Sequence, residues 1–157
     1  MELRGVDELM DLLHACRGAR DTPDHESNPV DLHDHALQTA ALLRRSHPSD
    51  KELQLAGLLQ AIGHLLPPRG APGHADRAAD AVRPLLGDRV ASLIRLHAQP
   101  PASDFGHTPA TEDAATLRQA AATARAAGLN AGILEDWRPV LELVAATAHA
   151  TPARTLR

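Results

Sequence analysis

Histidine is the residue type in this sequence best suited to do chemistry. The 157 residues include ten histidines but only one cysteine, Cys16. An imidazole can donate or accept a hydrogen bond, act as an acid or a base near neutral pH, and bind a metal ion. The first question is therefore which of these side chains could share one cavity.

Four histidines fall on the inner face or at the inner end of successive predicted helices: His35, His64, His74 and His97. His35, for example, lies one turn from Leu32 and Thr39 in an apolar stripe. Facing helices of a bundle build metal and catalytic sites in this way. One inward histidine is typical of a hydrogen-bonded core residue, whereas four in sequence favour a shared pocket.

The other six histidines are expected to be exposed. His33 lies nearly opposite the inward stripe of its helix. The rest lie in loops, near helix ends or on faces without an apolar pattern: His14, His25, His47, His107 and His149. Cys16 has no second cysteine to pair with, and we interpret it as a buried, inert thiol.

Helical periodicity predicts an all-α bundle of about six or seven helices. The segments are residues 6–16, a helix that begins near 29–31, then 53–66, 74–86, 88–97, 111–128 and about 135–149. Expected N-terminal caps are a capping box of Ser49 and Glu52, then Asp88, then Thr111. Pro84 is expected to bend or shorten the end of its helix.

Length and composition place these helices in one domain. The expected domain covers residues 1–157, with an ordered core at 6–150 and a loop or mobile lid at 98–110. The apolar share of 43% is mostly Ala, Leu and Val, with one Trp, one Phe and no Tyr. Such a core favours closely packed helices over sheets.

Charge and hydropathy limit which partners and which cellular location we expect for this protein. A net charge of −4 and the scarcity of aromatic residues argue against nucleic acid as a partner. No apolar run approaches the roughly 18 residues that span a bilayer, and the first residues carry no signal-peptide pattern. A cytoplasmic protein without membrane contact is therefore predicted. The alanine-rich segment 111–128 could pack against a second copy, which leaves a homodimer open.

Several segments together resemble, in order, the HD-domain superfamily. They are DHALQTAALL at 34–43, LAGLLQAIGHLL at 55–66, AADAVRPLLGDRVASLIRLH at 78–97, TLRQAAATA at 116–124 and DWRPVLE at 136–142. Within the superfamily, the chain resembles the small mixed-valence di-iron oxygenases that cleave organophosphonates, relatives of myo-inositol oxygenase. The resemblance runs from about Val6 to Leu143 and implies a single HD-domain-like helical bundle.

The resemblance also implies which metal ligands this chain lacks. In the family the third helix ends in His-Asp-x-Gly-His, whose first two residues bind metal, and here that place holds Gln60, Ala61, Ile62, Gly63 and His64. The family's last ligand is an aspartate, and the matching stretch here, from Leu117 to Ala121, contains no carboxylate. His35 matches the first metal-binding histidine and His64 a histidine that contacts substrate, while His74 and His97 match ligands of the second ion.

The missing ligands predict that no dinuclear metal centre forms. Two cations a few ångströms apart repel strongly in a low-dielectric cavity, and a bridging carboxylate offsets that repulsion. Gln60 offers only a weak amide oxygen. We therefore expect no cofactor, and neither dinuclear oxygenase nor phosphohydrolase activity. A single ion held by His74, His97 and a third imidazole is the metal-binding alternative, since three-histidine sites exist for zinc.

Whether the protein is an enzyme is left open by the residues. The preferred hypothesis is a pseudoenzyme whose former active-site pocket binds a small polar or anionic metabolite, for sensing or in support of a partner enzyme. The pocket residues would be His35, Gln60, His64, His74 and His97. In a variant of this hypothesis, the domain serves as an interaction scaffold, and the histidines are remnants of the former active-site pocket. The alternative is a metal-free enzyme of biosynthesis, such as a lyase, isomerase or cyclase, in which His35 or His64 acts as the acid or base.

Overall fold

Seven α-helices account for most of the described chain in this computed structural model. The structure describes residues 3, 5–17, 20–21, 30–60, 62–66, 73–98, 108–127 and 132–155. The helices are α1 (Val6–Ala15), α2 (Leu32–Ser46), α3 (Lys51–Leu59), α4 (His74–Leu86), α5 (Asp88–His97), α6 (Pro109–Ala127) and α7 (Arg138–Thr155). Two 3-10 helices, η1 (Ile62–Leu65) and η3 (Leu134–Trp137), lie between them. The prediction of an all-α bundle of six or seven helices is confirmed.

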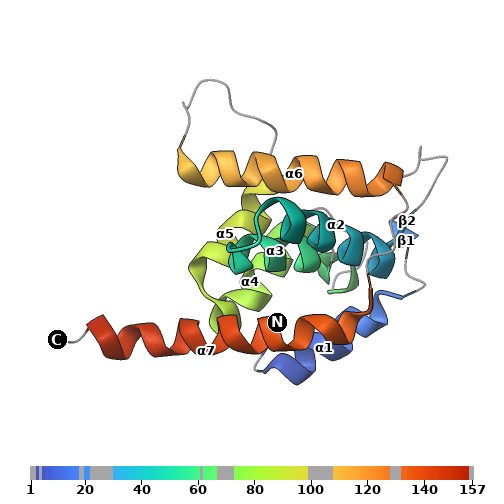
Figure 1. Ribbon diagram of the computed structural model, residues 1–157. Helices are drawn as coiled ribbons and strands as arrows, with labels where there is room; N and C mark the ends of the chain where they lie inside the picture. The colour runs from blue at the N-terminus through green and yellow to red at the C-terminus, as the bar shows by residue number, and fades with distance from the viewer. Residues whose placement is uncertain are drawn as a thin grey trace.

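Helices α2 to α5 form the centre of the molecule, and α6 and α7 lie on opposite sides of it (Figure 1). Helix α6 contacts α2, α3 and α5, whereas α7 contacts α1, α3 and α4. In the centre, α4 contacts both α5 and η1, and α3 contacts both α2 and α5. Three of the elements that carry the inward histidines, η1, α4 and α5, are therefore neighbours, and α2 is linked to α5 through α3.

The core is aliphatic, as the composition predicts. Every residue from 53 to 60 is buried, so α3 is the central helix. At Gly57 a Cβ atom would lie only 2.7 Å from Leu43 Cδ1, so the small residue lets α2 and α3 approach closely. Trp137, which is 1% exposed, lies under the guanidinium of Arg44 at 4.0 Å from the ring centre. Burying one large apolar side chain contributes about 2 kcal/mol, so the many buried side chains of this core are the main source of stability.

The predicted continuous helix over 53–66 is wrong. The α-helix ends at Leu59, and residues Ile62–Leu65 form the 3-10 helix η1. At Gly63 an added Cβ would collide with the backbone of His74, so η1 and the start of α4 meet backbone to backbone. An apolar run in a sequence does not distinguish an α-helix from a 3-10 helix. Here the 3-10 helix forms where the chain makes this tertiary contact.

Three of the predicted helix caps are also wrong, because neighbouring residues take the role. Asp50, not Ser49, caps α3, and its Oδ1 accepts a hydrogen bond from the Leu53 amide at 3.1 Å. Gly87, with φ of +97°, is the N-cap of α5 in place of Asp88. At α6 the amide of Thr111 donates to Thr108 Oγ1 at 3.2 Å, so the helix begins earlier than predicted. Helix α4 runs to Leu86 as predicted, and Pro84 inside it does not shorten it.

A short antiparallel strand pair precedes α2, and the sequence did not predict it. Strands β1 (Arg20–Asp21) and β2 (Val30–Asp31) pair Arg20 with Asp31 and Asp21 with Val30. The pair holds the chain at the start of α2, where the Asp31 side chain caps the helix.

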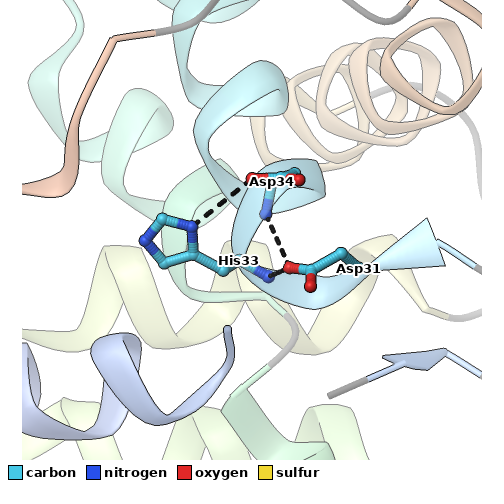
Figure 2. A group of neighbouring side chains, drawn as sticks. All are labelled: Asp31, His33 and Asp34. Carbon is cyan, nitrogen blue, oxygen red and sulfur yellow. Dashed lines mark hydrogen bonds and ion pairs between the residues drawn. The ribbon is translucent and has the colours of Figure 1, made fainter. Parts of the chain in front are cut away.

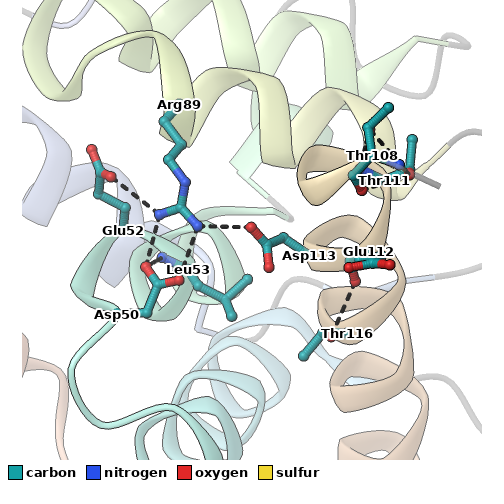
Figure 3. Close-up of polar contacts among 9 residues, drawn as sticks. All are labelled: Asp50, Glu52, Leu53, Arg89, Thr108, Thr111, Glu112, Asp113 and Thr116. Atoms are coloured by element: carbon teal, nitrogen blue, oxygen red, sulfur yellow. Dashed lines mark hydrogen bonds and ion pairs between the residues drawn. The ribbon is translucent and has the colours of Figure 1, made fainter.

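Arg89 joins three helices through ion pairs (Figure 3). Its Nη1 donates to Asp50 Oδ1 at 2.7 Å and to Glu52 Oε1 at 3.1 Å; Asp50 is the N-cap of α3, and Glu52 lies in its first turn. Its Nη2 donates to Asp50 Oδ2 and to Asp113 Oδ2 of α6, each at 2.9 Å. This cluster ties α5 to α3 and α6, and we interpret it as structural.

Candidate functional site

The four inward histidines come from four different elements and meet in one cluster, which we call the histidine cluster. His35 lies in α2, His64 in η1, His74 at the start of α4 and His97 at the end of α5. His35 is 7% exposed, and the other three side chains are half-buried. His97 interacts electrostatically with His35 and His74, and His74 interacts with His64.

The rings of His64 and His74 stack on each other. Their centroids are 4.0 Å apart, and the ring planes differ by 22°. The close approach of the Gly63 backbone to that of His74 brings the two residues together. Neither ring makes a hydrogen bond within the described part of the chain, so their nitrogens are left for a ligand or for water.

His35 and His97 are oriented by backbone carbonyls. His35 Nε2 lies 2.9 Å from Ala121 O, and His97 Nδ1 lies 2.6 Å from Ile94 O. A carbonyl oxygen only accepts, so each of these nitrogens carries the proton. When the ring is neutral, the other nitrogen of each ring holds a lone pair and can accept a hydrogen bond.

Burial lowers the pKa of all four imidazoles. The pKa of His64 falls to about 4, first because of burial and then because of the nearby charges of His74 and Arg77. Burial and Arg77 also lower the pKa of His74. For His35 and His97 burial is again the largest cause, and a backbone hydrogen bond opposes it. The cluster is therefore uncharged at neutral pH.

Two arginines add positive charge beside the cluster. Arg77 Nη2 donates to Gly63 O at 3.4 Å, which places the guanidinium near His64 and His74. Arg118 donates to His97 O through Nε at 3.0 Å and lowers the pKa of His97. An anionic ligand would be favoured by both charges.

Gln60 is held in the core. It is 6% exposed, and its Nε2 donates to Thr39 Oγ1 and Gly57 O, each at 3.4 Å. Thr39 Oγ1 in turn donates to His35 O at 2.8 Å, so Gln60 reaches the histidine cluster only through Thr39 and the His35 backbone. Ala61, the next residue in the stretch that was compared with the family's His-Asp-x-Gly-His motif, lies outside the described residues.

A small hollow opens beside His74. It has a volume of about 250 Å³ and is lined by Gly73, His74, Ala75, Asp76, Arg95 and Ala98. Asp76 accepts a hydrogen bond from Arg95 Nε at 3.2 Å, so the lining carboxylate is already paired. The volume suits a small metabolite rather than a large cofactor.

The histidine cluster does not assemble three metal ligands in this arrangement. Within the described ranges, a single group of three ligand residues has donor atoms all within 4.8 Å of one another, namely Asp31, His33 and Asp34. That group lies at the start of α2 (Figure 2). Whether one ion binds His74, His97 and a third imidazole stays an untested alternative.

His33 is buried, so the predicted exposure is wrong. Its side chain is 5% exposed, because α2 packs against α1, α3 and α6 and is covered on more than one face. Periodicity identified only the strongest of these faces. A histidine between two aspartates at a helix start was the signal that sequence reasoning missed.

The remaining histidines follow the prediction in part. His14 and His149 are exposed, and His14 Nε2 lies 2.8 Å from Glu135 Oε2. His47 is half-buried rather than exposed, and its Nδ1 lies 2.8 Å from Ser46 Oγ, while His25 and His107 lie outside the described residues. The same is true of residues 99–107 of the predicted lid.

Cys16 behaves as the predicted buried thiol. It is 1% exposed, and burial, followed by the charge of Asp31, raises its pKa to about 12. The thiolate that would act as a nucleophile is therefore not formed at neutral pH.

No protein-family model matches the sequence, and no curated protein gives a significant match. The site must therefore be interpreted from its own chemistry.

Across the described helices, none combines the length and the apolarity that crossing a bilayer requires.

Proposed function

We propose that this chain is a divergent HD-domain protein that binds a small polar or anionic molecule at the histidine cluster. The all-helical bundle and the order of the segments resembling that superfamily support the assignment. On this proposal the protein has lost the dinuclear metal chemistry of the family, because Gln60 and Ala121 stand where ligands would be.

The observation that carries the proposal is the stacked pair of His64 and His74. Both imidazoles are half-buried and make no hydrogen bond in the described chain, and His74 lines the 250 Å³ hollow. Burying polar groups without partners costs free energy, and a bound molecule that hydrogen-bonds to them would recover it. Arg77 and the N-terminal end of α4 favour negative charge on that molecule.

A binding measurement with inorganic phosphate tests the proposal. Isothermal titration calorimetry at pH 6 should detect phosphate binding to the wild type, and His64→Ala should weaken it at least tenfold. His149→Ala, which removes an exposed histidine on α7, is the matched control and should bind like the wild type. Equal affinity in all three proteins, or no binding in any, would contradict the proposal.

A metal-free enzyme is the second candidate, and the orientation of His35 and His97 favours it. Each ring has one proton held by a backbone carbonyl, so its other nitrogen can act as a base. Native mass spectrometry of the freshly purified protein should first identify a retained molecule. Conversion of that molecule by chelator-treated wild type, but not by His35→Ala, would establish an enzyme.

A further inference from the structure

The geometry points to a metal site at the start of α2, in which Asp31, His33 and Asp34 bind one divalent transition-metal ion of the zinc type. The three residues lie apart from the histidine cluster's stacked pair, and the function proposed above does not use them. The side chains are half-buried, buried and exposed, respectively. Figure 2 shows them around the first turn of the helix.

The ring of His33, which lacks hydrogen-bond partners in the described chain, is the main evidence that a ligand binds here. The side chain is 5% exposed, and neither Nδ1 nor Nε2 has a hydrogen-bond partner among the residues that the structure describes. Nδ1 points toward Asp34 and lies 3.6 Å from its Oδ1, which is too far for a hydrogen bond. A buried imidazole without a partner is costly, and a metal ion between His33 and Asp34 would supply a partner for Nδ1.

The two carboxylates are already placed to share such an ion. Asp31 Oδ1 accepts hydrogen bonds from the amides of His33 at 3.0 Å and Asp34 at 3.2 Å, which fixes its orientation. A carboxylate has about four lone-pair positions, so capping the helix and binding a metal are compatible. One donor atom from each residue lies within 4.8 Å of the others. Ligands at about 2.0 to 2.2 Å from one ion lie at most about 4.4 Å apart, so small side-chain rotations close the site.

The donor set selects the class of ion. An imidazole nitrogen with two carboxylate oxygens suits Zn²⁺, whereas Mg²⁺ and Ca²⁺ prefer oxygen ligands alone. Two carboxylates balance the charge of a divalent ion. Their attraction for the ion offsets its repulsion by the positive end of the helix dipole. The 67% exposed Asp34 side chain leaves a path for the ion and positions for water ligands.

Zinc titration of the whole chain tests this inference. Protein treated with chelator and then dialysed should bind one Zn²⁺ per chain, measured by calorimetry and by elemental analysis after desalting. Asp34→Asn should weaken binding at least tenfold. Because Asp34 is exposed, this variant should fold like the wild type by circular dichroism.

His33→Leu provides a second variant that does not depend on charge. Leucine is similar in size and has no polar atom to satisfy, so the variant should fold and should lose zinc binding. Asp88→Asn, an exposed carboxylate in the first turn of α5, is the matched control and should bind zinc like the wild type. His64→Ala should also bind zinc normally, which separates this site from the histidine cluster.

Two results would overturn the inference. One is a wild-type protein that binds no zinc at micromolar concentration. The other is zinc binding that survives in Asp34→Asn and His33→Leu but is lost in His64→Ala, which would place the ion in the histidine cluster. Neither result depends on whether phosphate binds there, so this inference and the proposed function can fail separately.

Discussion

A Cβ atom at Gly63 would occupy the space of the His74 backbone. The obstruction is backbone and not the end of a flexible side chain, so η1 and α4 would have to move apart. We expect Gly63→Ala to lower the free energy of unfolding by about 3 kcal/mol, as overpacking of a close contact does. Urea denaturation measures this change.

Gly5→Ala is the control for that substitution. No atom lies within 4 Å of a Cβ built at Gly5, and the residue has extended backbone at the N-cap of α1. The loss should be at most about 1 kcal/mol, the cost of a poorer N-cap. Similar losses in both variants would show that the contact between Gly63 and His74 is not tight.

Among the elements, α3, α5 and α6 are held together by Arg89. Replacing Arg89 with Met leaves Asp50, Glu52 and Asp113 without their shared cation. Because the guanidinium is 38% exposed, we expect a loss of about 1 kcal/mol at neutral pH. Arg83→Met, which removes longer and more exposed ion pairs on α4, should change stability by less than about 0.5 kcal/mol.

The same ion pairs predict how the loss depends on pH. The hydrogen bond from Arg89 lowers the pKa of Asp50 below the ordinary value of 3.8 for an aspartate. The stabilisation is therefore present above that value and is lost as the pH falls through the lowered pKa. The difference between wild type and Arg89→Met should narrow below pH 4, and a constant difference down to pH 2 would contradict this account.

For the whole molecule, the histidine cluster makes stability depend on pH near neutrality. Burial lowers the pKa of His64 to about 4 in the folded protein, from the ordinary value of 6.5 for a histidine. The unfolded chain therefore takes up the proton first as the pH falls, and stability falls between about 6.5 and 4. Allowing for the partial exposure of the ring, we expect a loss of about 1 kcal/mol from pH 7.5 to pH 5.

His64→Gln checks this assignment, because glutamine does not titrate in the range. Chemical denaturation at pH 7.5 and pH 5 should show a smaller loss of stability in the variant than in the wild type. His14→Gln, an exposed histidine, should keep the wild-type pH dependence. If His64→Gln keeps it as well, the cluster does not control stability in this range.

The sequence by itself determined the helical class and most helix positions. The apolar stripes of α1, α2, α4 and α5 repeat with helical periodicity, and an alanine- and leucine-rich core has few alternatives to packed helices. The same periodicity placed His35 and His97 inward, which is why these two candidate residues could be named before their positions were known.

The tertiary structure decided what local patterns do not encode. The contact of Gly63 with His74 coincides with the change from helix α3 to η1 and stacks two imidazoles, although 11 positions separate Gly63 from its partner in the sequence. His33 is buried because α2 is covered by several helices at once, whereas one periodic stripe reports only one face. Caps were misplaced by one to three residues because several neighbouring residues can end a helix, and the helix geometry chooses between them.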